Sequence, residues 1–137
     1  MSEIGKAMFG WLAAEGTGTT LYGLIGTRIT PEARTQGAVL PCAVYSISED
    51  ESEIALSGAT NFRKAQVEVV AVASTAASAA AVHEAIRTVL QGSKIIGTTV
   101  INHCLHIKSL TNYQAPIAGE AAGAFLHSAI YSVMYQD

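Results

Sequence analysis

The chain has 137 residues, the size of one ordinary domain, and a formal net charge of −3 from 8 basic and 11 acidic residues. Hydrophobic residues make up 50% of the sequence and charged residues 14%, against about 25% charged in an average soluble domain. These values exclude a disordered chain and a strongly basic duplex-binding domain, and two cysteines do not make a disulfide-stapled scaffold.

Neither a secretory signal nor a membrane segment is expected. The N-terminus, Met1–Lys6, carries an acid at Glu3 and leads into no continuous apolar stretch. The longest weakly polar run, residues 69–82, is shorter than the ~20 residues that cross a bilayer. Since no membrane accounts for the low charge content, that content favours a surface partly buried against other subunits. The alternative is a surface rich in Ala, Gly, Ser and Thr.

The first half of the chain predicts one long helix and one clear strand. Apolar residues recur with helical period at Ile4, Met8 and Trp11–Leu12, which predicts a helix over residues 3–15. Alternation of Ala43, Tyr45 and Ile47 with their neighbours predicts a strand over residues 41–48. The shorter pieces are a helical turn at 21–25, an extended piece at 27–30, an irregular stretch at 31–40 and a partly extended return at 54–58.

The second half predicts most of the sheet and one more helix. Residues 62–73 form the clearest strand, apolar on one face throughout and on the other face only from Val70 onward. A helix over 75–91, capped by Ser74 or Thr75, has an apolar stripe. The stripe consists of Ala79, Val82, Ile86 and Val89 or Leu90. The remaining elements are strands at 95–101 and 103–110, a loop at 112–123 and a long strand at 124–135.

This order of elements predicts an α+β fold: a small single domain over residues 1–137 with a mostly antiparallel sheet and helices packed on one face. A hairpin over about residues 42–67 is expected to project as an arm. At its tip we place the acidic run Glu49, Asp50, Glu51 and Glu53. Such a run is either a solvated turn or a contact for a cationic surface.

No motif in the sequence predicts catalysis or a bound cofactor. His103 and His106 would point to opposite faces of a strand, so they do not converge on one metal ion. His83-Glu84 begins like a zinc-protease motif, but Arg87 stands where the second ligand would be. No nucleophile elbow is present, although a pair between Cys104 and a histidine stays open.

Two segments and their order in the chain resemble a known family. They are Gly26-Thr27-Arg28-Ile29-Thr30-Pro31 and Leu40-Pro41-Cys42-Ala43-Val44-Tyr45, followed by the strand around Val67 and the helix around Arg87. In this order and spacing the chain resembles the tail completion, or tail terminator, proteins of long-tailed bacteriophages and gene-transfer agents. The resemblance implies a structural virion protein of the tail or neck, made in the bacterial host cytoplasm, without catalytic residues.

The resemblance also implies partners. Proteins of this family form a ring, usually of six copies, that caps the tail tube and joins it to the head-side connector or stopper, with the genome passing through the lumen. The matching positions read as fold or interface positions: Arg28, Pro31, Pro41, Tyr45, Gly58, Val67 and Arg87. The candidate contacts to a neighbouring subunit or the tube are Glu49, Asp50, Glu51, Glu53, Arg63 and Lys64.

Two alternative functions stay open. Within the same machinery, the chain could serve as a head-closure protein or as another minor tail protein. From a different class, it could be a small ligand-binding domain or an enzyme, and a monomer with a closed, histidine-lined pocket would favour that reading.

Overall fold

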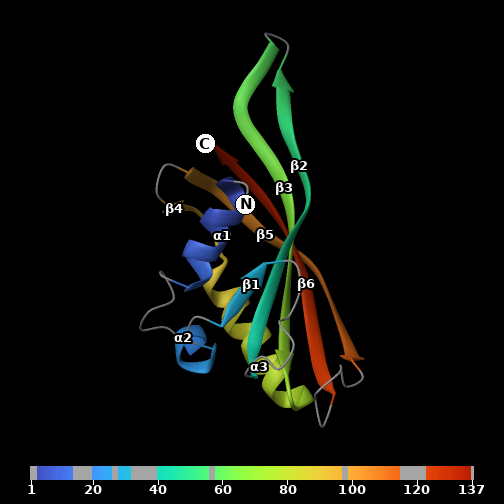
Figure 1. Cartoon of the computed structure of the whole chain (residues 1–137). Helices are drawn as coiled ribbons and strands as arrows, with labels where there is room; N and C mark the ends of the chain where they lie inside the picture. Colours follow the sequence, from blue (N-terminus) through green and yellow to red (C-terminus); the bar gives the residue numbers. More distant parts are fainter. Residues whose placement is uncertain are drawn as a thin grey trace.

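A computed structural model describes residues 3–13, 20–25, 28–31, 40–55, 58–96, 99–114 and 123–136 (Figure 1). Along the chain, two helices are followed by three strands, a third helix and three more strands. In order they are α1 (Glu3–Ala13), α2 (Thr20–Ile25), β1 (Ile29–Pro31), β2 (Cys42–Ala55), β3 (Gly58–Ala73), α3 (Ala76–Val89), β4 (Lys94–Ile96), β5 (Thr99–Gln114) and β6 (Ala124–Gln136).

The strands form one six-stranded sheet in the order β1-β2-β3-β6-β5-β4. Every neighbouring pair is antiparallel except β1–β2, which is parallel. The predicted mostly antiparallel sheet is confirmed, and the parallel edge strand is an addition that the sequence did not predict. The helices of the described ranges are each too short or too polar to cross a membrane.

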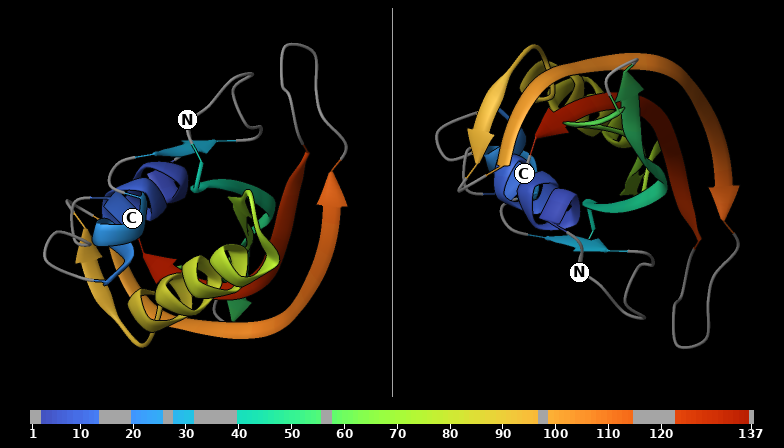
Figure 2. Two further views of the ribbon diagram at one scale, coloured as in Figure 1. Left: turned by 90° about the horizontal axis from the view of Figure 1, so that it is seen from below. Right: turned by 90° about the horizontal axis from the view of Figure 1, so that it is seen from above.

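The sheet curls around helix α1. This helix contacts both β1 and β4, the two outermost strands, so the ends of the sheet must approach it from opposite sides (Figure 2). The curl is accompanied by register shifts in both outer long pairs, β2–β3 and β5–β6, whereas the central β3–β6 pair runs without one. Such bulges add local twist and bend the strands that carry them.

The main core lies between the helices and the concave face of the sheet. The apolar stripes predicted for the two long helices are buried there, with Ile4, Met8 and Leu12 from α1 and Val82 and Ile86 from α3. The large tyrosines of this core are Tyr45, Tyr131 and Tyr135. Helix α3 begins at the predicted cap, because the Thr75 side chain accepts a hydrogen bond from the Ser78 backbone N–H at 3.1 Å.

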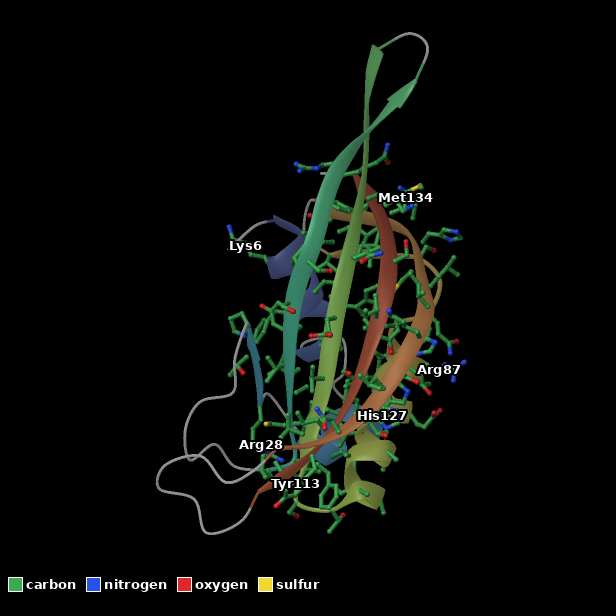
Figure 3. All side chains as sticks on the ribbon, turned by 90° about the vertical axis from the view of Figure 1, so that its right-hand side faces the viewer. Lys6, Arg28, Arg87, Tyr113, His127 and Met134 are labelled. Carbon is green, nitrogen blue, oxygen red and sulfur yellow. The ribbon has the colours of Figure 1, made fainter. Side chains whose placement is uncertain are left out.

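A smaller cluster lies on the opposite face of the sheet. It contains Cys42, Val44, Val72 and Ala124, with Val70 and Leu126 packed against it. This cluster explains why β3 becomes apolar on both faces toward its end, as the sequence predicted. Outside this cluster, the described residues of the convex face are half-exposed or exposed, and Figure 3 looks onto that face with β2, β3, β6 and β5 side by side.

The strand boundaries predicted after α3 were wrong. The sequence predicted one strand at 95–101 and another at 103–110, but β4 ends at Ile96 and β5 runs unbroken from Thr99 to Gln114. The polar residue Asn102 does not end the strand, because the register with β6 shifts there and the ladder continues at His103. Residues 112–114, predicted as loop, therefore belong to β5, and residues 115–122 lie outside the described part.

Candidate functional site

The β2–β3 hairpin projects beyond the other strands (Figures 1 and 3). The last described pair between β3 and β6 joins Phe62 to Gln136, so residues 58–61 of β3 extend past it with their β2 partners. The hairpin reverses between Ala55 and Gly58, which face each other in register. Strands β2 and β3 thus form a hairpin, whose reversal lies beyond residues 49–53, where the sequence analysis placed the tip.

The acidic run lies in a strand rather than at the tip of the hairpin, so its predicted position was wrong. Glu49, Asp50 and Glu51 lie in β2, where they stand opposite residues 66, 65 and 64 of β3, and Glu53 lies farther along the same strand. The reason is tertiary: Ile54 pairs with Ala59, which carries the ladder past the acids and moves the reversal beyond them.

The two basic candidates of β3 lie on different faces of the sheet. Lys64 is exposed on the convex face and stands opposite Glu51, next to Met134 on the other side. Arg63 stands opposite Tyr135 and places its guanidinium 5.9 Å from the centre of that ring. The structure therefore brings Lys64 beside the acidic stretch in register and directs Arg63 to the core side.

Strand β5 carries a concentration of exposed apolar side chains. Leu105, Ile107, Leu110 and Tyr113 are all more than half exposed, with Leu110 at 69%. The strand pairs with β6 on one side, but on its other side β4 covers it only from Thr99 to Ile101. From Asn102 to Gln114, none of the described strands pairs with its outer side. Long apolar edges of this kind mark interaction surfaces.

Three histidines that are distant in sequence come together from α3, β5 and β6 (Figure 3, His127). The rings of His83 and His127 stack with centres 3.9 Å apart and planes 8° apart. His106 forms T-shaped ring contacts with His83 and Tyr131, with ring centres 5.8 Å and 5.5 Å apart. The sequence analysis missed this cluster, although His83 lies between the stripe residues Val82 and Ile86 and could have been assigned to the buried face.

Burial holds two of these imidazoles in the neutral form. For both His83 and His127, loss of hydration is the main cause that lowers the pKa below 6.5, and neighbouring histidines lower it further. The Glu84 carboxylate, 4.0 Å from His83 Nε2, acts in the opposite direction. The buried His106 Nε2 and Tyr131 hydroxyl have no hydrogen-bond partner within the described ranges.

Neither a metal site nor an activated thiol is found among the residues that the structure describes. In the described part of the chain, no three His, Cys, Asp or Glu side chains are grouped so as to hold a metal ion. His103 stands opposite Met134 on the convex face and His106 opposite Tyr131 on the core face, as predicted. Burial raises the pKa of the Cys104 thiol to about 12, so the nucleophilic thiolate is scarce at neutral pH.

Lys108 does not share a face with Cys104 and His106, although simple alternation along a strand would place all three on one side. The register shifts between His106 and Lys108, so Lys108 stands opposite Ile130 and reaches the convex face instead. The shift places its ammonium group on the side of the sheet that the helices leave open.

Arg28, one of the positions that match the family pattern, has a structural role. Its Nε donates to the Pro41 carbonyl at 2.9 Å and a terminal nitrogen donates to the Leu24 carbonyl at 3.0 Å. Its backbone carbonyl accepts from the Ala43 N–H at 3.0 Å. Arg28 therefore ties helix α2 to the start of β2, and Tyr45 and Val67, which also match the pattern, are buried in the core.

Comparisons with known proteins identify the family of this chain. Residues 6–114 match the profile of the family described as "Tail completion protein gp17". A chain in the solved structure "Virion of native gene transfer agent (GTA) particle" has the same fold, with a TM-score of 0.66 and 14% identity over 96% of this chain and 93% of that one. No curated protein matches. The chain belongs to the tail completion protein gp17 family and is a structural component of a phage-type tail, not an enzyme.

Proposed function

We propose that this protein forms a ring of six copies that caps the finished tail tube and joins the tail to the head-side connector. Membership of the tail completion family carries this proposal. The ring sits at the neck of the virion, and the genome passes through its lumen without sequence-specific contacts.

The shape of the subunit supports a ring. A closed ring of identical subunits needs two different, complementary surfaces on each copy. The curled sheet offers two such surfaces at opposite ends of its strand order: the outer side of β2 beyond its short pairing with β1, and the outer side of β5 beyond its short pairing with β4. The low charge content of 14% also suits a surface that neighbours cover.

The hairpin carries the remaining candidate contacts. In this proposal the hairpin meets the tail tube or a neighbouring copy. The residues assigned to these contacts are Glu49, Asp50, Glu51, Glu53, Arg63 and Lys64. Charged groups at such a contact would guide assembly and set its rate more than they would tighten the final complex.

The test is to delete the gene for this protein from the phage or gene-transfer agent that encodes it, and to supply the protein again from a plasmid. We expect filled heads and unattached tails without the protein, joined particles with the plasmid, and a six-fold ring of this chain in images of the restored neck. Tails of irregular length would accompany the loss, because an uncapped tube keeps an open growing end. Heads that lose their genome while tails stay normal would instead assign the protein to head closure. A twelve-fold ring, or particles that join without the protein, would contradict the proposal.

A further inference from the structure

We propose that neighbouring copies in the ring join by β-strand addition, in which residues 103–108 of β5 pair antiparallel with residues 46–51 of β2 of the next copy. The inference rests on the proposed ring and specifies the interface within it. The partner that pairs with the open edge of β5 is a second copy of this chain.

The two edges are open over the stretch that the proposal uses. Strand β1 covers β2 only at residues 43–45, and β4 covers β5 only at residues 99–101. Beyond these pairs, no described strand pairs with the outer side of either one. An open edge of this length exposes a row of unpaired backbone donors and acceptors, which another strand can satisfy.

The open stretches lie at the same height in the sheet. The pairing register can be followed from β2 through β3 and β6 to β5. Residues 46–51 of β2 and residues 108–103 of β5 are level, which means that they are joined through the same paired residues of β3 and β6. Strand β1 closes the β2 edge below this window and β4 closes the β5 edge above it. The chains of paired residues that mark its two ends are Ser46–Glu68–Ile130–Lys108 and Glu51–Lys64–Met134–His103. Rotation about an axis along the strands would therefore bring the two windows together without a shift along that axis.

The strand directions also fit. The pairs β2–β3, β3–β6 and β6–β5 are all antiparallel, so β2 and β5 run in opposite directions within one subunit. A neighbour related by rotation about an axis along the strands keeps these directions. Its β2 then lies antiparallel to the β5 that it meets, which is the more stable form of strand pairing.

The residues in the two windows have complementary charge. The β5 window contains Lys108 and two histidines and no acid, whereas the β2 window contains Glu49, Asp50 and Glu51 and no basic residue. The β5 edge also presents Leu105 and Ile107, more than half exposed in the single subunit, which an added strand would flank. At this register Lys108 is level with Ser46 and diagonal to Glu49 on the same face, so the opposite charges lie within reach of each other, which favours this pairing over pairing of two β5 edges.

Disulfide trapping in assembled particles tests the inference. Glu49 and Leu105 are level, since both are joined through the Gln66–Ser132 pair. Directly opposed residues of antiparallel strands lie ~4.5–5.5 Å apart at Cα, within the range that a disulfide spans. The variant Glu49→Cys with Leu105→Cys should therefore give a ladder of cross-linked species under mild oxidation. Replacing Glu49→Cys by Glu51→Cys tests a register shifted by two residues.

The control pair combines Leu105→Cys with Ser74→Cys, an exposed residue before α3 and away from both edges. The native Cys42 and Cys104 are buried, so they contribute little background. Particles that contain the ring but give no ladder with Glu49→Cys or Glu51→Cys beyond that of the control would overturn strand addition and leave the proposed function standing. Particles whose neck lacks a ring of this chain would overturn the proposed function itself.

A charge exchange keeps the inference testable if the cysteine variants fail to assemble. Lys108→Glu should weaken each interface by about fivefold, because attraction across the strands becomes repulsion, and the loss multiplies around a closed ring. Adding Glu49→Lys and Glu51→Lys should restore particle yield. Lys6→Glu makes the same change of charge on an exposed residue of α1, outside both windows, and is the matched control. Equal yields from Lys108→Glu and Lys6→Glu, or no rescue by the lysine exchange, would contradict the pairing.

Discussion

Lowering the pH from about 7.5 to about 5.5 should destabilise the folded protein through His83 and His127. Burial lowers the pKa of both imidazoles below 6.5 in the fold, with a further lowering by His106 and, for His83, by Arg87 on its own helix. The Glu84 carboxylate opposes this but does not reverse it. In the unfolded chain both groups take up protons near pH 6.5, so below that pH the unfolded state binds more protons than the folded state. The stabilisation is complete above pH 6.5 and is lost as the pH falls.

The size of the effect has an upper limit. A group that titrates only in the unfolded state lowers the free energy of unfolding by about 1.4 kcal/mol between pH 7.5 and pH 5.5 when its unfolded pKa is 6.5. Two such histidines therefore contribute at most about 2.7 kcal/mol. With a urea dependence of about 2 kcal/mol per molar, the unfolding midpoint would fall by up to about 1.4 M. His83 is only 3% exposed, so water does little to screen its environment.

Urea unfolding at a series of pH values, followed by the fluorescence of the single, buried Trp11, measures this slope. The variants His83→Gln and His127→Gln should each remove part of it, and together most of it. His103→Gln, which replaces an exposed histidine of β5, is the matched control. A midpoint that stays constant down to pH 5.5, or a slope that survives the double replacement, would refute the reasoning.

Three further predictions concern stability. Gly23→Ala in helix α2 adds a methyl group with no atom within 4 Å and should raise the free energy of unfolding by about 0.5–1 kcal/mol. In Gly10→Ala the new methyl would lie 2.9 Å from Ile96 Cγ2, so that gain should be lost. Thermal unfolding of both variants measures the difference, and equal gains would contradict it. Arg28→Lys should cost about 1–3 kcal/mol in urea unfolding, because an ammonium group cannot reproduce the two hydrogen bonds to the Pro41 and Leu24 carbonyls, and wild-type stability would argue against the structural role of Arg28. Tyr131→Phe should leave stability unchanged or raise it by about 1 kcal/mol in calorimetry, because the buried hydroxyl has no partner in the described residues, and a loss above about 1 kcal/mol would mean that the hydroxyl is bonded.

The sequence by itself determined the elements whose apolar residues repeat along one segment. The stripe of Ile4, Met8 and Leu12 predicted helix α1, and the alternation through Val67 and Val69 predicted β3 and its buried face. These patterns are local, because a helix or strand must turn its apolar side chains to one side wherever the core lies. The order of motifs around Arg28 and Pro41 likewise sufficed to indicate the family.

Tertiary structure alone decided which distant segments meet and in which register. No local pattern pairs β1 parallel to β2, carries β5 through Asn102, or places the acids of β2 inside a ladder with β3. The shift after His106 turns Lys108 to the convex face, and the stack of His83 on His127 exists only because α3 lies across β6. Each of these features depends on contacts between residues far apart in the chain. A bulge of one residue reverses the face of every side chain that follows, so alternation along a single strand cannot predict it.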